Sequence, residues 1–113
     1  MTYSKKNAFS SDLQEIASIC KVLSHPARIA ILQHLSNCNT CISGDISKEI
    51  PLSRTTVSQH LQELKKAGLI QGEIDGVKMC YCLNNKSIKK HFNKLHNVID
   101  EILKENKLNK CCK

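Results

Sequence analysis

The chain has 113 residues, enough for one domain with a modest hydrophobic core. Its net charge of +7 favours a polyanionic partner, while two Tyr, two Phe and no Trp argue against a protein that stacks single-stranded bases. The sequence has neither the apolar core of a signal peptide nor a stretch as long as a membrane span, so we expect a cytoplasmic protein without a membrane partner.

Two amphipathic helices are predicted after a flexible, mildly basic arm at residues 1–10. The first is expected from Ser11 to about Leu23, where apolar residues recur at helical spacing. The second is expected from Pro26 to Leu35, because proline suits the first turn of a helix. The residues predicted to be buried are Leu13, Ile16, Ala17, Cys20 and Leu23 in the first helix and Ile29, Ile31, Leu32 and Leu35 in the second. Cys20 is therefore expected to pack in the core or in an interface.

Seven cysteines are many for a chain of this length, and their odd number argues against a disulfide framework, so we expect reduced thiols. Cys38 and Cys41 form a Cys-x-x-Cys pair in the polar loop after the second helix. Two thiols at this spacing can turn toward one soft ion, although one pair does not complete a tetrahedral zinc site. No βαβ pattern surrounds them, so a thioredoxin-like motif is not indicated. Two unrelated loop cysteines are the alternative interpretation.

A helix-turn-helix is predicted after this loop. A short helix near 43–50, with Ile46 and Ile50 inward, is followed by Pro51 and by Ser53, which can cap a second helix. The apolar stripe of this second helix consists of Val57, Leu61 and Leu64. Its other face begins with Ser, Thr, Gln and Arg side chains, which are able to read base edges in a major groove. A polar surface helix without a ligand is the alternative.

Beyond a helix stop at Gly68, a β-hairpin is predicted around Asp75-Gly76, since both positions of a tight turn favour positive φ. Its strands are expected at 69–74 and 77–83. Alternation places Val77, Met79, Tyr81 and Leu83 on one face of the second strand and Lys78, Cys80 and Cys82 on the other. Lys78 is close enough to the turn to reach a phosphate. The two cysteines form either a second dithiol or, more simply, ordinary strand residues.

One long helix is predicted from Ser87 to about Leu108. Its apolar seam consists of Ile88, Phe92, Leu95, Ile99 and Ile102. A narrow terminal seam of this kind suits pairing with another helix and argues for a homodimer. Cys111 and Cys112 follow in a flexible tail at residues 106–113, where vicinal thiols have no packing role and become candidates to complete a ligand site elsewhere.

The polar and imidazole side chains of the helices are expected at the surface. Arg28 is predicted to point outward, and His25 and His34 to be surface or capping residues. His91 and His96 do not share a helix face at the i, i+4 spacing of a two-histidine metal site. They are therefore expected to be solvated.

Three motifs in order match one known family: KVLSHPARIAILQHL at 21–35, LSRTTVSQHLQELKKAGLI at 52–70 and EIDGVKMCYCLN at 73–84. On these motifs the sequence resembles the ArsR/SmtB family of winged-helix metalloregulatory repressors. The resemblance implies an α+β, mainly α fold over residues 11–105: a winged helix-turn-helix with a two-stranded wing and flanking dimerisation helices.

The resemblance also implies a homodimer that binds double-stranded operator DNA, represses its own operon and is released by an inducer. The family's DNA contacts carry over to Ser53, Arg54, Thr55, Thr56, Ser58, Gln59 and His60, with Lys78 in the wing near the backbone. An enzyme is not expected, because the chain shows no nucleophile paired with a base, no phosphate-binding glycine loop and no carboxylate dyad.

The sensor departs from the family's patterns. Arsenic-type members carry Cys-x-Cys-x-x-Cys before the recognition helix, and the aligned residues here, Ile42, Gly44 and Ser47, are not ligands. Zinc and nickel members use Asp and His pairs on the last helix, which His91 and His96 do not reproduce. A hard-metal sensor at the dimer helix is therefore disfavoured.

Trivalent arsenic, antimony or an organoarsenical, each satisfied by two or three thiolates, fits the cysteines better. The expected ligands are Cys38 and Cys41, with Cys111 or Cys112 from either subunit as the third; Cys20 is a weaker candidate. No organic cofactor is expected. The alternative is a repressor of the same fold that answers to oxidants, sulfide or another soft metal through a cysteine pair.

Overall fold

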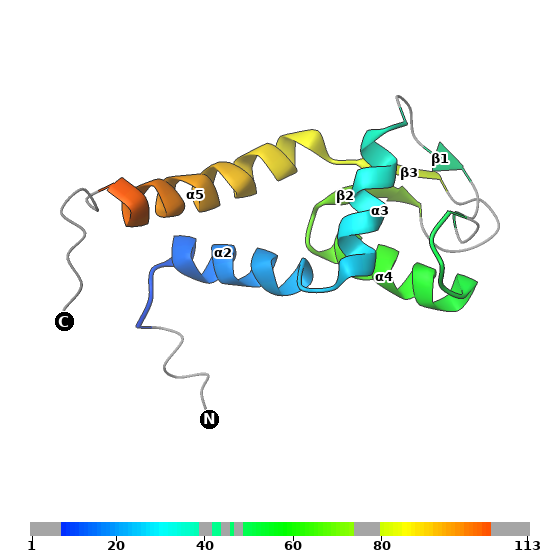
Figure 1. Cartoon of the computed structure of the whole chain (residues 1–113), viewed down its shortest axis with the longest axis horizontal. Coiled ribbons are helices and arrows are strands. Elements are labelled where there is room, and N and C mark those ends of the chain that lie inside the picture. The colour runs from blue at the N-terminus through cyan, green and yellow to red at the C-terminus, as the bar shows by residue number, and fades with distance from the viewer. Residues whose placement is uncertain (1–7, 39–41, 44–45, 47–48, 74–79, 105–113) are drawn as a thin grey trace.

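The computed structural model describes residues 8–38, 42–43, 46, 49–73 and 80–104. Its elements in chain order are α2 (Ser11–Val22), α3 (Pro26–Ser36), β1 (Ile42–Ser43), α4 (Arg54–Lys66), β2 (Ile70–Glu73), β3 (Cys80–Leu83) and α5 (Asn85–Lys104) (Figure 1). The chain is mainly helical with one small sheet, which confirms the predicted fold class. None of the described helices is long and apolar enough to cross a membrane.

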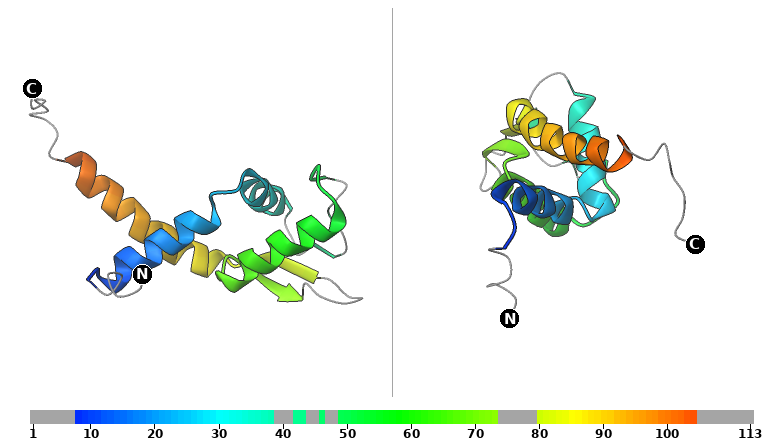
Figure 2. Two further views of the ribbon diagram at one scale, coloured as in Figure 1. Left: turned by 90° about the horizontal axis from the view of Figure 1, so that it is seen from below. Right: turned by 90° about the vertical axis from the view of Figure 1, so that its left-hand side faces the viewer.

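The helices fall into two groups along the molecule (Figures 1 and 2). The first and last helices, α2 and α5, lie against each other at one end. At the other end α3 contacts both α4 and β3, and α4 contacts β2. The helix-turn-helix and the sheet therefore form one body, and the α2–α5 pair extends from it.

The sheet has three antiparallel strands in the order β1-β3-β2. β2 and β3 are the predicted hairpin strands, with Ile70 opposite Leu83, whereas the turn between them lies outside the described residues. β1 adds a strand to the two-stranded wing that the sequence predicts. Ser43, expected to begin a helix, instead lies in β1 opposite Cys80, because the edge of β3 offers backbone hydrogen-bond partners that outweigh the local pattern.

Two glycines hold backbone conformations that other residues rarely adopt. Gly68 has a φ of 82° directly after α4, which confirms the predicted helix stop. Gly72 in β2 has a φ of 119°, and a Cβ at this position would lie 2.2 Å from the carbonyl oxygen of Cys80. The close approach of β2 to β3 thus requires a residue without a Cβ atom at position 72.

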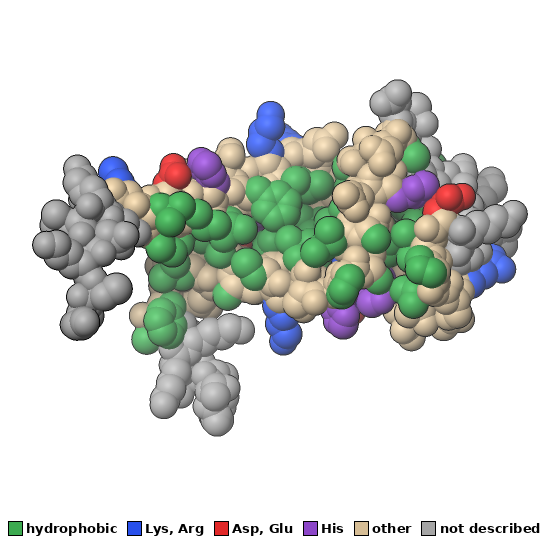
Figure 3. Space-filling view, viewed as in Figure 1, with side chains coloured by type: hydrophobic (Ala, Val, Ile, Leu, Met, Phe, Trp, Pro, Cys, Tyr) green, Lys and Arg blue, Asp and Glu red, His purple; other side chains and the backbone are tan. Residues whose placement is uncertain are grey.

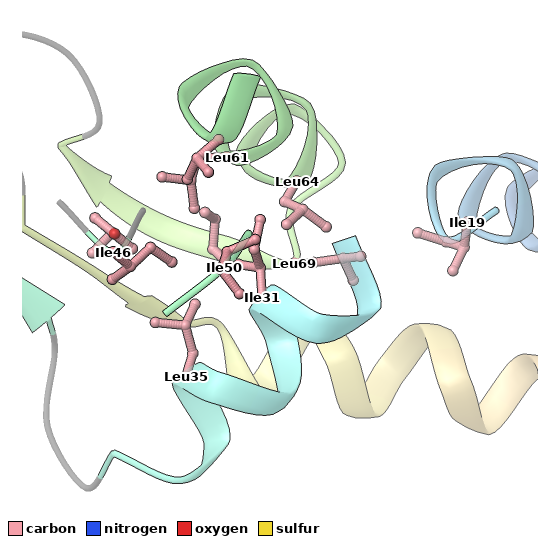
Figure 4. Packing of buried hydrophobic residues seen from close by; sticks show 11 residues of the cluster. Ile19, Ile31, Leu35, Ile46, Ile50, Leu61, Leu64 and Leu69 are labelled. Atoms are coloured by element: carbon pink, nitrogen blue, oxygen red, sulfur yellow. The ribbon is translucent and has the colours of Figure 1, made fainter. Parts of the chain in front are cut away.

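The hydrophobic core lies between α3, α4 and the sheet (Figure 4). Its buried members are Ile19, Ile31, Leu35, Ile46, Ile50, Val57, Leu61, Leu64, Leu69, Ile70 and Tyr81. The predicted stripe of α4 and the inward position of Ile46 and Ile50 are confirmed. Ile19 on α2 lies away from the other labelled members, which are grouped around α3 and α4 (Figure 4).

Several side chains predicted to be buried lie on the surface instead. Leu13 is 45% exposed, Ile29 is 49% exposed and Cys20 is exposed. On the long helix Ile99 and Ile102 are also exposed, as is the neighbouring Leu103. Hydrophobic side chains gather over α2 and α5 and continue toward α3 on one face of the molecule (Figure 3). The apolar periodicity of these helices therefore marks side chains that are exposed on the described part of the chain.

The predicted boundaries of α2 and α3 agree with the structure to within one residue. The short helix predicted near 43–50 is not found at its described residues, because Ser43 is in a strand and Glu49 and Ile50 form a turn and a bend. α5 begins at Asn85, before the predicted Ser87, since the Asn84 side-chain oxygen accepts a 3.2 Å hydrogen bond from the Ser87 amide. The predicted end at Leu108 lies outside the described residues, as do the arm at 1–7 and the tail at 106–113.

Candidate nucleic-acid interface and thiol positions

An N-cap fixes the residue at which α4 begins, and a buried apolar stripe fixes which side of the helix faces the core. Ser53 Oγ accepts a 3.2 Å hydrogen bond from the Thr56 amide and donates one of 3.0 Å to Thr56 Oγ1. This confirms the predicted N-cap. Val57, Leu61 and Leu64 are at most 1% exposed, so they hold the opposite side of the helix in the core. The polar side of α4 is consequently turned away from the protein.

The residues expected to contact DNA lie along this polar side and at its margins. Those classed as exposed are Ser53, Arg54, Thr55 and Gln59, whereas Thr56, Ser58 and His60 are half-buried. Lys65 and Lys66 at the end of α4 are also exposed. Lys78 of the wing lies outside the described residues. The contacts of these side chains with DNA stay predictions.

His60 faces α3 and is part of a small cationic cluster. Arg28 Nε donates a 3.0 Å hydrogen bond to His60 Nδ1, and Arg28 Nη1 donates one of 3.2 Å to the Val22 carbonyl. The His25 and His60 rings lie 5.4 Å apart between centroids. Arg28 is thus half-buried and engaged, so the expectation that it points outward is wrong. Its long side chain folds back because two acceptors are within reach.

The pKa of His60 is lowered from its ordinary value. Burial is the largest cause, because it disfavours the charged imidazolium, and the positive charges of Arg28 and His25 act in the same direction. The neutral ring leaves Nδ1 free to accept the Arg28 hydrogen bond.

A second polar cluster joins α2 to α5. Glu15 on α2 contacts His91 Nδ1 at 2.5 Å and Lys94 Nζ at 2.8 Å, and Lys94 also pairs with Asp12 at 3.0 Å. The hydrogen bond from Lys94 lowers the pKa of Glu15 most, with His91 adding to the shift and desolvation opposing it. The pKa of Lys94 is raised, chiefly by its hydrogen bond to Glu15 and then by the one to Asp12.

This cluster corrects the interpretation of the two histidines on α5. His91 is half-buried against Glu15 instead of solvated, whereas His96, 70% exposed, is solvated as expected. Sequence reasoning did not find the pairing, although a signal was present. Asp12 and Glu15 lie three residues apart on α2 and form a short acidic patch. His91 and Lys94 have the same spacing on α5 and form a short basic patch.

The described cysteines differ in environment. Cys20 and Cys80 are exposed free thiols, and Cys38 is a half-buried free thiol whose Sγ lies 3.4 Å from the His34 carbonyl oxygen. Exposure excludes the core packing expected for Cys20. Cys82 is disulfide-bonded, so the expectation of reduced thiols is wrong for this residue.

The proposed thiol-ligand set is only partly within the described residues. Cys41, Cys111 and Cys112 lie outside them. Among the residues that the structure describes, no three His, Cys, Asp or Glu side chains are grouped so as to hold a metal ion. The ligation of a metal or metalloid by these cysteines stays a prediction.

A capped helix with a polar outer face, preceded by a turn and followed by an antiparallel wing, defines a winged helix-turn-helix DNA-binding regulator. Comparison with known proteins agrees. The family model described as bacterial regulatory protein, arsR family, matches residues 25–71.

The chain is 31% identical over 85 residues to the HTH-type transcriptional regulator YgaV of Escherichia coli (strain K12), covering 75% of this chain and 86% of that protein. It is 30% identical over 90 residues to the arsenical resistance operon repressor of Staphylococcus aureus, with coverages of 80% and 75%. An ArsR-like transcriptional regulator from Rhodococcus sp. RHA1 has a similar fold, with a TM-score of 0.64 at 23% identity over 81% of this chain and 86% of that chain.

The chain therefore belongs to the ArsR family of bacterial regulatory proteins. It is a transcriptional regulator and not an enzyme, as the sequence predicts.

Proposed function

We propose that this protein is a homodimeric repressor that binds operator DNA through α4 and leaves it when a thiol-seeking inducer binds its cysteines. The polar face of α4 is the observation that carries the DNA-binding part. Ser53 fixes the start of the helix, and the buried stripe turns Thr55 and Gln59 outward. Short polar side chains held in this way can reach base edges without first having to be ordered.

The test is binding of the full chain to the DNA upstream of its own coding region over a series of salt concentrations. A repressor with this net charge should lose affinity with a log–log slope of about −0.9 per phosphate neutralised. Gln59→Ala should weaken specific binding by about 1–3 kcal/mol and binding to unrelated DNA much less. Gln33→Ala, an exposed glutamine on α3, is the matched control. A slope near zero, or equal effects of both variants, would contradict the proposal.

The uncovered apolar side chains of α2 and α5 support the dimer. Leu13 on α2 and Ile99, Ile102 and Leu103 on α5 are 44–64% exposed. A single chain of this size gains no stability from leaving such a surface in water, whereas a second copy can cover the same patch on both subunits. The paired subunits would present two copies of α4 to two half-sites of the operator.

The cysteines support a soft inducer, with trivalent arsenic as the first candidate. Cys38 is a free thiol, and its sequence partner Cys41 is three residues away. Arsenite and antimonite bind two or three thiolates, so Cys111 or Cys112 of either subunit would complete the set, with Cys20 as the weaker choice. The relative from S. aureus is named as an arsenical resistance operon repressor, which agrees with this choice.

A repressor that responds to oxidants or sulfide is the second candidate. Cys82 supports this candidate, because it is disulfide-bonded while Cys20, Cys38 and Cys80 are free thiols. Counting free thiols in the dimer before and after arsenite, and separately after mild oxidation, distinguishes the two inducers.

A further inference from the structure

The cationic cluster of His25, Arg28 and His60 lies where α3 begins and where it packs against α4. Arg28 Nε is 3.0 Å from His60 Nδ1, and the rings of His25 and His60 are 5.4 Å apart between centroids. His25 is the N-cap residue of α3, and its side chain makes no capping hydrogen bond there. It is exposed, so the cluster can be reached from solvent.

The positive charge of this cluster has no acidic partner among the described residues. Within that part of the chain none of its three side chains forms an ion pair with a carboxylate, whereas Lys66 and Lys94 do. Burial lowers the pKa of His60 most, and the positive charges of Arg28 and His25 lower it further. An anion beside the three groups would offset their mutual repulsion.

The hydrogen bond from Arg28 determines which nitrogen of His60 carries the proton. Nδ1 accepts from Arg28 Nε, so the neutral ring holds its proton on Nε2, and Nε2 is a donor. Arg28 Nη1 is used by the Val22 carbonyl, while Nη2 has no hydrogen bond to a described residue. Arg28 and His60 therefore both retain N–H groups for a ligand with several acceptor oxygens.

His60 lies at the margin of the polar side of α4. It follows the exposed Gln59 by one residue, a rotation of about 100°, and directly precedes the buried Leu61. A helix about 10–12 Å wide fills a major groove of about 12 Å, so residues at its margin face the sugar–phosphate backbone instead of the base edges. An orientation of α4 that presents Gln59 to the bases would thus bring the cluster close to a backbone phosphate.

We propose that His25, Arg28 and His60 bind one phosphate of the operator backbone, and that His60 contacts this phosphate instead of reading base edges. The guanidinium supplies a permanent charge and the N–H groups of Nη2, and the His60 ring supplies the N–H of Nε2. Such contacts fix the register and orientation of a protein on DNA and do not depend on base sequence. The inference rests on the proposed function, because it needs α4 to lie in the major groove.

Arg28 is already ordered before it meets DNA. Its two hydrogen bonds, to His60 Nδ1 and to the Val22 carbonyl, hold the guanidinium between α3, α4 and the end of α2. An arginine on an open surface loses rotamer freedom when it binds a ligand, whereas an arginine that is already held loses less. We therefore expect Arg28 to contribute more to DNA affinity than an exposed lysine such as Lys104.

The test is a coupling experiment with the full chain and the DNA upstream of its coding region. Single phosphates of the operator are replaced, one at a time, by uncharged methylphosphonates, and the affinity for each duplex is measured by fluorescence anisotropy. At the phosphate that the cluster binds, the unmodified protein should lose affinity by about tenfold or more. Arg28→Gln should lose as much on unmodified DNA and little further on the duplex substituted at that position.

The salt dependence of binding gives a second readout. Arg28→Gln should make the log–log slope less steep by about 0.9 and should weaken binding to the operator and to unrelated DNA by the same factor. A residue that only holds α4 in place would instead weaken operator binding more and leave the slope unchanged. Lys104→Gln, which removes an exposed charge at the far end of α5, is the control and should change neither property.

His25→Ala keeps the test independent of folding. Should Arg28→Gln fail to fold, as judged by circular dichroism, the His25 variant gives the answer, because this side chain is exposed and makes no hydrogen bond to a described residue. It should weaken binding to both DNAs by about two- to tenfold. His34→Ala in the last turn of α3 is the matched control and should bind like the unmodified protein.

Inorganic phosphate tests the cluster without DNA. At constant pH and ionic strength, the Cε1–H NMR signals of His25 and His60 should shift with sodium phosphate, and those of His34 and His96 should not. The absence of a shift at both cluster histidines would overturn the proposal. So would salt-dependent operator binding in which Arg28→Gln is coupled to no single phosphate, and the proposed function would then still stand. Phosphate-dependent shifts in a chain that binds no DNA would refute the proposed function and leave only the anion site.

Discussion

Arg28 on α3 donates a 3.0 Å hydrogen bond from Nε to Nδ1 of His60 on the recognition helix α4. The same guanidinium bonds the Val22 carbonyl at the end of α2, so one side chain connects three helices. Only the neutral imidazole has an acceptor at Nδ1. Protonation of His60 must therefore break this contact and place two cations side by side.

We expect the free energy of unfolding to decrease as the pH falls through the His60 transition. The folded pKa of His60 lies below its unfolded value of about 6.5, so the unfolded state takes up the proton first as the pH decreases. The contribution of His60 to the free energy of unfolding is complete above about pH 6.5 and is lost as the pH falls through its lower folded pKa. Urea denaturation at pH 7.5 and pH 5.5 measures the difference.

The His60→Asn variant isolates this contribution. Its amide oxygen can accept from Arg28 but does not titrate, so the decrease in stability between the two pH values should become smaller. His96→Asn on α5 is the control, because His96 is 70% exposed and lies on another element. If both variants lose stability to the same extent between the two pH values, the pH dependence comes from other groups.

The fold was predictable to the extent that local patterns determined it. The Ser53 cap, the α4 stripe and the Gly68 stop are each set within a few residues, so the recognition helix follows from the sequence. β1 does not, because Ile42 and Ser43 are extended only through pairing with β3, which lies far along the chain. Pairing between distant segments is not visible in the periodicity of a short one.

Gly72→Ala should destabilise the wing, and with it the domain, by more than about 1 kcal/mol. The backbone φ of 119° is unfavourable for alanine, and the added Cβ would lie 2.2 Å from the Cys80 carbonyl oxygen, a backbone atom that cannot move aside cheaply. Gly68→Ala is the comparison, since there the nearest atom is the Ser87 hydroxyl at 3.2 Å and only the φ of 82° is strained. Thermal unfolding should give a lower Tm for Gly72→Ala than for Gly68→Ala. The reverse order of the two Tm values would contradict the close approach of β2 and β3.

Ile102→Glu should convert the dimer to a monomer. Ile102 is 64% exposed on α5, and a carboxylate at this position would have to lose its water in the proposed dimer interface. Asn93→Glu introduces the same charge on the opposite face of the same helix, because nine residues correspond to two and a half turns. Sedimentation equilibrium should show a monomer for Ile102→Glu and the unchanged assembly for Asn93→Glu. A dimer in both variants would place the interface elsewhere.

The candidate sites were predictable in kind but not in their partners. The spacing of Cys38 and Cys41 indicates a thiol site, yet it does not reveal which third residue approaches them, since that depends on how distant segments are folded together. Likewise His60 was assigned to DNA by its place in the recognition motif, while its contact with Arg28 comes from the packing of α3 on α4. The periodicity of apolar residues indicates which face of a helix is buried, but it does not indicate which residues of other elements pack against that face.

Replacing Cys38 and Cys41 together with Ser should leave operator binding of the reduced protein intact and abolish its release by arsenite. The substitution removes two of the thiolates that the inducer needs but does not touch α4, whose cap and buried stripe are formed by other residues. Fluorescence anisotropy of labelled operator DNA, titrated with arsenite under reducing conditions, measures both properties. Cys80→Ser, an exposed free thiol of the wing, should still be released like the unmodified protein. An inducer shifts the DNA-bound population only if it binds the bound and released states with unequal affinity. Release of the double variant at the same arsenite concentration would therefore show that arsenite binds at other residues.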